Sequence, residues 1–581
     1  GPAAMMSQRR LCGNLLFLLL LPKIALAFVP VVGLQRAMPG HRSNLSPSRD
    51  AAFLRVLSSR NPSAPRGWRT KVPVAMSGFS PPFVGSIDDG TQSCRCIIFD
   101  QKGKVVTKAQ KQKQQIFPQP GWCEQDPRDI IDNVRFCIEE AVKDLQRLGH
   151  SVEEVKGVGI TNQRETTVIW DRKTGKPLHN AIVWLDTRNS KTCEDLANAH
   201  GGRDAFRRKC GLPISTYFSG VKLKWLFDTF PEILAKAERG EVMFGTVDSW
   251  LIYNLTGKHV TDVTNACRTM LMNLEALKWD EEVCSKFGVP MSILPEIKSS
   301  AEIYGDILDG PLKGIPVAAC LGDQQSACVG HCAFNPGDSK NTYGTGCFLL
   351  MNTGEKPSFS NNGLLSTVCY QLGADAPAIY ALEGSVAIAG VGVSWLRDNM
   401  KFLEHAEESE KVARSVPDTG GVYFVPAFSG LFAPYWKEGA RGAILGLTQF
   451  TTSAHIVRAL LEAVAFQTAD VVDAIMKDSG IQLTRMKVDG GMTANDVLME
   501  FQADVLGATV MRPAMREVTA LGAALAAGLA VGVWKNIQEL EKVQSDTCDY
   551  TFFQSKMDTE TRKMKKMKWE DAVKRTFDWV Q

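Results

Sequence analysis

From about residue 83 onward, short apolar runs alternate with longer stretches in which apolar residues recur at helical spacing. The runs at 155–160, 168–170 and 315–320 predict buried strands, and the stretches at 130–148 and 456–478 predict helices. This alternation is typical of an α/β architecture with helices covering sheets. Because Asn335-Pro336-Gly337-Asp338 interrupts the pattern, we predict two domains, at 83–332 and 333–581.

The first 80 residues follow a different pattern. Arg9 and Arg10 precede a leucine-rich run, and Ala25-Leu26-Ala27 resembles a cleavage site, so 1–27 reads as a signal peptide. Residues 28–80 are rich in Arg, Ser and Pro without periodicity, which predicts a disordered, transit-like segment. A signal-plus-transit leader favours import into a plastid. The secretory pathway, the mitochondrion and the cytoplasm remain alternatives.

Composition narrows the class of protein. A net charge of +3 is small for 581 residues and argues against a nucleic-acid partner. The basic run at 562–568 lies next to Glu570 and Asp571, so we interpret it as a solvated helix face. The 15 cysteines show neither metal-site nor disulfide spacing, which predicts a reduced protein. We expect no stable membrane association of the mature protein.

Two distant segments share one pattern: an extended arm, a Gly-Thr tip and a returning apolar arm. They occupy 85–100 and 340–352, and each predicts a β-hairpin. Small turn residues let backbone N–H groups and hydroxyls approach phosphate oxygens. Asp88 enters the first turn, where a carboxylate can hold Mg²⁺. A duplicated phosphate-binding hairpin indicates a kinase or ATPase.

Polar residues at 159–167 follow a predicted buried strand. Burying polar groups costs free energy unless a ligand or another group compensates them. Arg164 and Glu165 together offer donors and acceptors to a polyol, and Trp184 and Tyr217 offer aromatic walls. The alternatives are an ion pair at a sheet edge for Arg164 and Glu165, and plain core for the aromatic residues.

Asp323 ends another predicted strand, and open α/β sheets place ligands at such ends. A carboxylate there can accept the proton of a hydroxyl that attacks a phosphate. Asp323 is therefore our candidate for the general base. The alternative is a helix N-cap.

The segment 488–495 predicts a strand that enters a Gly-Gly turn, a surface on which adenine can lie, with Asn495 nearby. The small residues of 384–392 offer a second wall. Tight helix–sheet packing would explain these glycines equally well. The chain has no GxxxxGK[ST] loop and no protein-kinase HRD or DFG motif.

Taken together, several motifs resemble glycerol kinases of the FGGY carbohydrate kinase family, over roughly 84–581. They are Asp88-x-Gly90-Thr91, ITNQRETT (160–167), AIVW (181–184), YFSG (217–220), FGTVDSWL (244–251), GDQQ (322–325), NTYGTGCF (341–348) and VDGG (488–491). The resemblance implies two actin-like, ribonuclease-H-like domains with a catalytic cleft between them. It also implies ATP and Mg²⁺ as cofactors, glycerol as substrate and sn-glycerol 3-phosphate as product. We expect a homo-oligomer, either a dimer or a tetramer.

The resemblance also implies roles for individual residues. Asp323 would be the base and Asp88 the metal ligand. Glycerol would be bound by Arg164, Glu165, Trp184, Tyr217, Asp323, Gln324 and Phe348. The nucleotide would be bound by Gly90, Thr91, Gln92, Ser93, Arg95, Thr345, Gly390, Gly491 and Asn495.

The first hairpin departs from the family pattern, since DDGTQSCR replaces a sequence closer to DQGTTSSR. We expect Asp89 to add negative charge near the phosphates and Gln92 to remain an amide donor. Ser394 replaces a longer Gln and would loosen the nucleoside pocket. A different sugar or polyol kinase of the family, for a pentulose for instance, would change the aromatic box formed by Trp184, Tyr217 and Phe348, which this chain keeps. A non-catalytic relative would have lost Asp323 or Asp88, and both are present.

Overall fold

The computed structural model describes residues 78–428 and 430–580. The predicted leader segments 1–27 and 28–80 lie outside the described residues, except for the last three positions.

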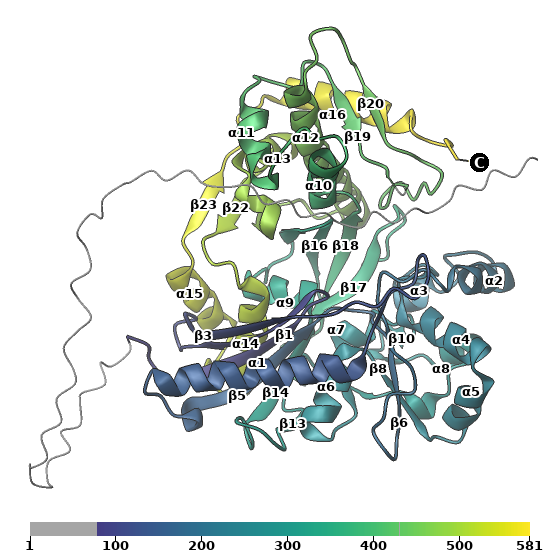
Figure 1. The fold of residues 1–581 in the computed structure, drawn as a ribbon, viewed down its shortest axis with the longest axis vertical. Helices are drawn as coiled ribbons and strands as arrows, with labels where there is room; N and C mark the ends of the chain where they lie inside the picture. Colours follow the sequence, from purple (N-terminus) through teal and green to yellow (C-terminus); the bar gives the residue numbers. More distant parts are fainter. Residues whose placement is uncertain (1–77, 429, 581) are drawn as a thin grey trace, which may run out of the picture. The chain divides into compact units, whose positions relative to one another are not determined.

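The first half of the described chain is built on a six-stranded sheet (Figure 1). Its order is β13-β14-β5-β1-β2-β3, in which β5 and β14 run parallel to β1, and β2 and β3 return antiparallel. Its strands are β1 (Phe83–Asp89), β2 (Ser93–Phe99), β3 (Val105–Gln112), β5 (Val155–Asn162), β13 (Gly305–Asp306) and β14 (Pro316–Gly322).

The second half repeats this topology. Its seven-stranded sheet has the order β17-β18-β16-β15-β21-β22-β23, with β21 and β22 continuing in parallel from the hairpin strand β15. Its strands are β15 (Asp338–Tyr343), β16 (Cys347–Gly354), β17 (Leu365–Tyr370), β18 (Ile379–Val386), β21 (Arg485–Asp489), β22 (Val510–Pro513) and β23 (Tyr550–Phe553). Each sheet therefore carries one Gly-Thr hairpin at its centre, and the prediction of two related α/β halves is confirmed.

Helices and short strands connect and cover the two sheets. In the first half these are α1 (Pro127–Arg147), β4 (Glu124–Gln125), β6 (Val168–Asp171), β7 (Ala181–Ile182), α2 (Ser190–His200), α3 (Arg207–Cys210), α4 (Ser219–Thr229), α5 (Pro231–Glu238), β8 (Val242–Gly245), α6 (Val247–Thr256), β9 (Val260–Asp262), α7 (Val263–Ala266), β10 (Met272–Asn273), β11 (Lys278–Trp279), α8 (Glu281–Phe287), β12 (Glu296–Lys298) and α9 (Asp323–Gly330). In the second half they are α10 (Gly390–Asp398), α11 (Ser409–Arg414), β19 (Tyr423–Val425), β20 (Ala443–Leu445), α12 (Ser453–Ser479), α13 (Asp496–Leu506), α14 (Val518–Ala530), α15 (Ile537–Thr547) and α16 (Thr559–Lys574).

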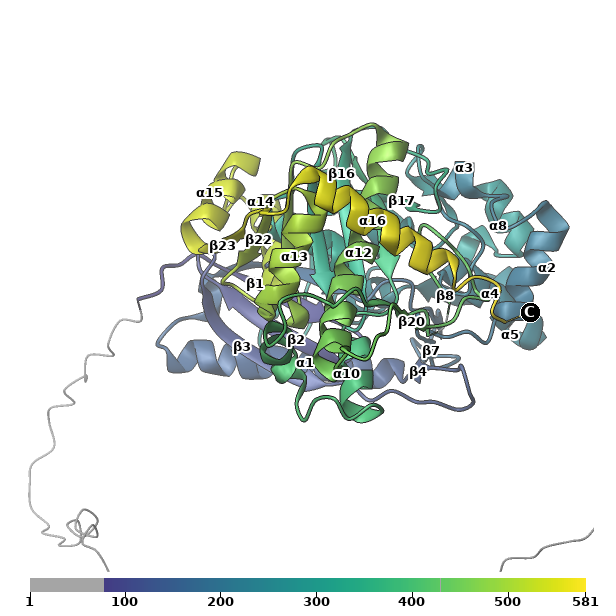
Figure 2. The same cartoon turned by 90° about the horizontal axis from the view of Figure 1, so that it is seen from above.

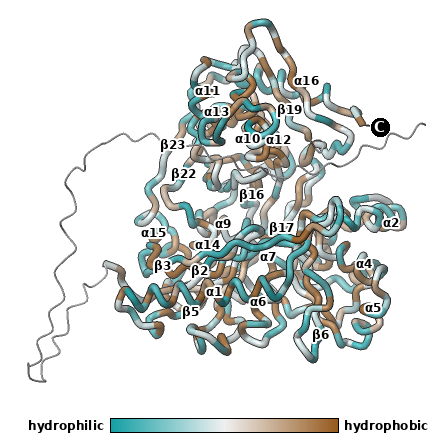
Figure 3. Tube along the Cα trace, viewed as in Figure 1, coloured by the Kyte–Doolittle hydropathy of each residue, from teal (hydrophilic) through white to brown (hydrophobic). Residues whose placement is uncertain are grey.

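The two faces of the first sheet are covered by helices from different halves of the chain. Hydrophilic and hydrophobic residues alternate along α1, whose apolar side packs with Phe83 and Ile87 of β1 (Figure 3). The neighbouring side chain Val84 points to the other face and packs with the nearly all-apolar α14. The first sheet therefore depends on a helix that lies almost 200 residues beyond its last strand.

The strands predicted at 155–160, 168–170 and 315–320 are β5, β6 and β14, and the predicted helices are α1 and α12. The basic run lies on α16, which crosses α12 and α13 and stacks Trp569 on Phe466 with ring centroids 5.2 Å apart (Figure 2). All 14 cysteines within the described ranges are free and buried. No helix of the described chain is long and apolar enough to cross a membrane.

The contact between α9 and α14 requires glycine on both helices. A Cβ on Gly522 would overlap the carbonyl oxygen of Ser326, and one on Gly330 would overlap that of Val518. Where no neighbour contacts the position, replacing a helical glycine with alanine raises the free energy of unfolding by roughly 1 kcal/mol. We expect Gly522→Ala instead to lower the melting temperature by several degrees, because the backbones must separate. Thermal unfolding followed by circular dichroism checks this, and a raised melting temperature would contradict the close approach.

Candidate active site

The polar segment after β5 adopts a strained turn. Gln163 donates its backbone N–H to Asp89 O at 2.9 Å, and the chain then turns through Glu165 at φ 60°. This left-handed conformation is uncommon for a residue other than glycine and is held only where its surroundings fix it. The Ser219 hydroxyl, 3.0 Å from Glu165 O, supplies part of that support. The turn directs both Arg164 and Glu165 into the protein, where each is at most 3% exposed.

Four buried charges meet at this turn. The Arg164 guanidinium donates to both oxygens of Glu383, at 2.6 and 3.0 Å. Arg268 donates to Glu165 at 2.6 Å and to Glu383 at 3.1 Å. The alternative of a simple Arg164–Glu165 pair at a sheet edge does not describe this arrangement, because Arg164 Nε lies 3.9 Å from Glu165 and the close partner is Glu383. Sequence reasoning missed both Arg268 and Glu383.

Glu383 holds this network together electrostatically. Burial alone would raise the pKa of its carboxyl, but Arg164 and Arg268 outweigh burial and lower that pKa to about 2. Glu383 belongs to β18 in the second half, whereas the other three residues belong to the first half. The ionised Glu383 therefore connects the second half to the Arg164–Glu165 turn of the first half.

Asp323 lies directly beside this network. It is the first residue of α9, and its Oδ1 lies 3.5 Å from Arg164 Nε and 2.8 Å from the Gln324 backbone N–H. Gly322 makes the approach possible, since a Cβ there would lie 2.8 Å from the Arg164 side chain. The Asp323 side chain is 26% exposed, and burial raises its pKa above the usual value despite Arg164 and Lys340. Gly322, one position earlier than the alternative supposed, is the N-cap residue of α9, while the Asp323 carboxylate accepts a first-turn N–H from Gln324.

Three aromatic side chains come together as the family resemblance implies. The Trp184 ring meets Tyr217 at 5.5 Å and Phe348 at 6.1 Å between centroids, both nearly edge to face. Trp184 also donates its indole N–H to the Thr91 hydroxyl at 2.9 Å. A wall of the predicted acceptor site thus contacts the first Gly-Thr hairpin directly.

Gln324 is held by a buried cation. Its Oε1 accepts a hydrogen bond from Lys340, which also donates to the Thr342 hydroxyl at 3.1 Å and the Phe348 carbonyl at 3.3 Å. Lys340 is completely buried at the start of the second hairpin and is a further residue whose importance the sequence did not indicate.

The first hairpin concentrates charge at its base. Asp88 and Arg95 face each other across β1 and β2 at 3.2 Å, and Glu517 lies 3.4 Å from the same Arg95 nitrogen. Burial raises the pKa of Asp88 to about 7, because Arg95 offsets burial only in part and Asp323 and Glu517 add to the shift. The carboxylates of Asp88 and Glu517 beside Arg95, with Asp323 close enough to affect Asp88, are oxygen donors suited to a hard divalent cation.

One expectation for this hairpin is wrong. Asp89 does not add free negative charge near the phosphate position, because its carboxylate lies 2.6 Å from Lys113 Nζ and both side chains are at most 2% exposed. Successive side chains of a strand point to opposite faces, so Asp88 and Asp89 have different surroundings. Of the other predicted residues here, Gln92 is exposed, and Gly90, Thr91 and Ser93 are partly exposed.

The second hairpin lies against the predicted nucleoside residues. Gly344 O accepts a hydrogen bond from Gly390 N at 3.0 Å, and Thr345 O accepts from Val391 N at 3.2 Å. Gly490 packs so closely on Tyr343 that a Cβ would overlap it, which brings the turn containing the exposed Gly491 to this hairpin. Asn495 instead has protein partners at both ends of its amide, the Leu498 N–H at 3.1 Å and the Ser409 hydroxyl at 3.2 Å.

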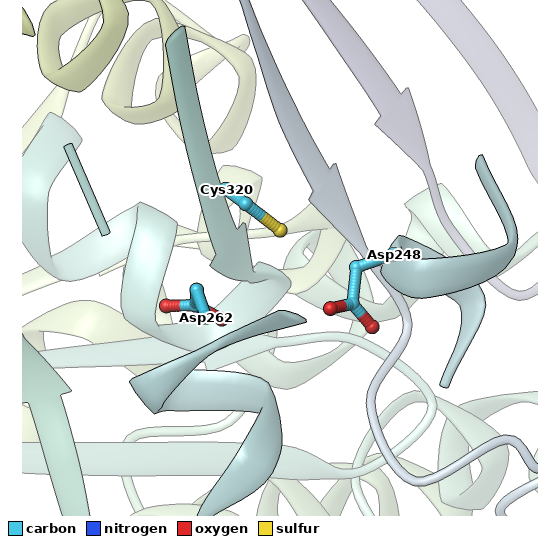
Figure 4. Close-up of side chains that lie close together, drawn as sticks. All are labelled: Asp248, Asp262 and Cys320. Atoms are coloured by element: carbon cyan, nitrogen blue, oxygen red, sulfur yellow. The ribbon is translucent and has the colours of Figure 1, made fainter. Parts of the chain in front are cut away.

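A second acidic cluster lies behind β14. Asp248, Asp262 and Cys320 are all buried with their side-chain ligand atoms within 4.8 Å of one another (Figure 4). Hydroxyls of Thr246 and Thr261 donate to Asp248, and backbone N–H groups of Thr264 and Asn265 donate to Asp262 at 2.9 Å. These carboxylates therefore hold β9 and the starts of α6 and α7 together beside β14, the strand that precedes Asp323.

The charge network generates a prediction about stability. Because the pKa of Glu383 is lowered to about 2 from 4.5, its ionised form contributes stability above pH 4.5 that is lost as the pH falls through about 2. We expect Glu383→Gln to reduce the free energy of unfolding by about 3 kcal/mol near pH 7, with the deficit narrowing toward pH 3. Urea unfolding from pH 3 to 8 measures this, with the 82%-exposed Glu560→Gln as control. If Glu383→Gln lowered the free energy of unfolding by less than about 1 kcal/mol, or by the same amount at every pH, the ionised Glu383 would not be stabilised by its two arginines as described.

Comparison with known proteins agrees with this geometry. Residues 83–330 match the N-terminal domain model, and 339–531 the C-terminal domain model, of the FGGY family of carbohydrate kinases. Glycerol kinases from Roseiflexus sp. (strain RS-1) and Nocardia farcinica are 54% and 52% identical over 86% of this chain and 99% of theirs. The crystal structure of Plasmodium falciparum glycerol kinase with ADP matches with a TM-score of 0.81 and 42% identity, over 87% of this chain and 100% of that one. A xylulose kinase from Lactobacillus acidophilus, at 21% identity and a TM-score of 0.75, shares the fold. The chain belongs to the FGGY family of carbohydrate kinases.

Proposed function

We propose that this protein transfers the γ-phosphoryl group of ATP to glycerol, giving sn-glycerol 3-phosphate and ADP. One observation carries the proposal: the aromatic box, the Arg164–Glu165 turn and Asp323 converge beside the first Gly-Thr hairpin. Relatives that are more than 50% identical over nearly their whole length are named glycerol kinases.

Glycerol is a small chain with three hydroxyls, and the site offers matching groups. Trp184 and Phe348 flank its carbon backbone, while Tyr217 closes the box at the Trp184 edge. Arg164, Glu165 and Gln324 supply donors and acceptors to the hydroxyls. Because Glu383, Arg268 and Lys340 hold these polar groups in place, little reorganisation accompanies binding.

Asp323 acts as the general base. As the terminal hydroxyl oxygen of glycerol bonds to the γ-phosphorus, the bond from that phosphorus to the bridging oxygen of ADP breaks, and the hydroxyl proton passes to the Asp323 carboxylate. Both protein contacts of Asp323 fall on Oδ1, so Oδ2 is the oxygen suited to accept the proton.

ATP lies between the two hairpins in this proposal. Gly90, Thr91, Gln92, Ser93, Arg95 and Thr345 surround the phosphates, and Gly390 and Gly491 border the nucleoside. Asn495 contributes through the turn that it caps, since both ends of its side chain are engaged. Asp88 would hold Mg²⁺, since burial and the neighbouring Asp323 and Glu517 raise its pKa to about 7 and a bound cation would favour its ionised form. When bound, the ion would neutralise phosphate charge.

Asp323→Asn tests the proposed chemistry. The amide preserves the shape of the side chain but cannot accept the proton, so we expect kcat with glycerol to fall by roughly 10³-fold or more while MgADP affinity stays within about twofold. Glycerol-dependent ADP release measures kcat, beside a panel of pentuloses, hexoses and dihydroxyacetone. Undiminished turnover in the variant would refute the assignment of the base, and turnover on another acceptor alone would refute glycerol.

Phe348→Ala tests the aromatic box. Loss of the ring contact is expected to raise the KM for glycerol about tenfold, because apolar area against the carbon backbone is lost. Phe450→Ala, which truncates a 70%-exposed ring, serves as the matched control. Initial rates over a range of glycerol concentrations give both values, and an unchanged KM in Phe348→Ala would place glycerol elsewhere.

A further inference from the structure

We propose that Lys113 is a positioning residue for nucleotide binding, which fixes the turn of the first Gly-Thr hairpin from beneath through its buried pair with Asp89. The inference rests on the proposed function only in taking this hairpin as the phosphate-binding element. Lys113 lies one position after β3, outside both Gly-Thr hairpins.

Lys113 binds the turn at three points. Its Nζ donates to Asp89 Oδ2 at 2.6 Å and to the Gly90 carbonyl at 3.1 Å. Its backbone N–H donates to the Gln92 carbonyl at 2.8 Å. One residue therefore contacts the positions before, within and after the Gly90-Thr91 tip.

The other carbonyls of the turn are also taken by protein donors. Asp89 O accepts from Gln163 N at 2.9 Å, and Thr91 O accepts from Gln125 Nε2 at 2.8 Å. Four consecutive carbonyl oxygens, from 89 to 92, thus accept hydrogen bonds from protein donors. A carbonyl oxygen that faced a phosphate would repel it, so holding these four groups in place favours nucleotide binding.

The buried charge of Asp89 makes Lys113 necessary. The Asp89 side chain is completely buried, and its second oxygen, Oδ1, has no hydrogen-bond partner among the described residues. Without Lys113, this carboxylate would be left uncompensated directly under the turn. Removing one partner of a buried ion pair destabilises the fold far more than removing both partners together, because the remaining charge is left without compensation. The two residues are therefore expected to act as one unit.

This coupling distinguishes a positioning role from simple packing. Lys113→Met keeps the side-chain stem but removes the ammonium, so the turn should distort around an unpaired Asp89. Asp89→Asn leaves the contacts of Lys113 with Gly90 and Gln92 available. In the double variant no buried charge remains, and the turn should recover its shape. Lys111→Met is the matched control, since Lys111 lies two positions earlier, on β3, and is exposed.

The test is isothermal titration of the full chain with MgADP, together with the thermal shift caused by glycerol. We expect Lys113→Met to weaken MgADP binding about tenfold or more, Asp89→Asn to weaken it about threefold, and the double variant to return within about threefold of wild type. Lys111→Met should bind as wild type does. The glycerol shift should change much less than MgADP affinity in all four, since the turn reaches the acceptor residues only through the hydrogen bond of Trp184 to Thr91.

MgADP affinity within twofold of wild type in Lys113→Met would overturn the proposal. So would a double variant no better than Lys113→Met, or an equal loss of the glycerol shift. If Lys113→Met does not fold, Asp89→Asn decides, and unchanged MgADP affinity there overturns the proposal. Neither readout requires turnover, so a wild-type protein that fails to phosphorylate glycerol would refute the proposed function and leave this test intact.

Discussion

The structure depends most on the buried contact of Glu383 with Arg164 and Arg268. Charges removed from water are tolerated only when each has a close partner, and here two carboxylates and two guanidinium groups satisfy one another. Because Glu383 belongs to the second sheet and the other three residues belong to the first half of the chain, the network aligns the two halves. It also fixes Arg164 beside Asp323, so the candidate base and its surroundings are set before any ligand arrives.

A second feature links the acceptor site to the nucleotide site. Trp184 contacts Tyr217 and Phe348 with its ring and Thr91 with its indole N–H, so one side chain takes part in both. Lys113 and Gln125 donate hydrogen bonds to the Gly90 and Thr91 carbonyls of the same hairpin. Positioning of this kind matters for phosphoryl transfer, in which catalysis consists largely of alignment and charge neutralisation.

Sequence patterns predicted the alternating strands and helices and both hairpins, and the family resemblance implied that Trp184, Tyr217, Phe348 and Asp323 belong to one site. They could not predict Glu383 as the partner of Arg164, because the two residues are 219 positions apart and only the folded chain brings them together. A lone carboxylate in the apolar run of β18 was the one available signal. The expectation that Asp89 adds negative charge near the phosphates was wrong for a similar reason. Lys113, which neutralises Asp89, directly follows β3 and not the strand that carries Asp89. The leader and the oligomeric state stay predictions.

The most direct test of the central claim is the fate of the transferred phosphoryl group, followed by ³¹P NMR of the wild-type protein with ATP, Mg²⁺ and glycerol. A preformed acceptor site in which Asp323 faces a bound hydroxyl predicts one sn-glycerol 3-phosphate for each ADP formed, with little inorganic phosphate. Inorganic phosphate as the main product, or ADP release that does not depend on glycerol, would show that water reaches the γ-phosphate first and would contradict the account.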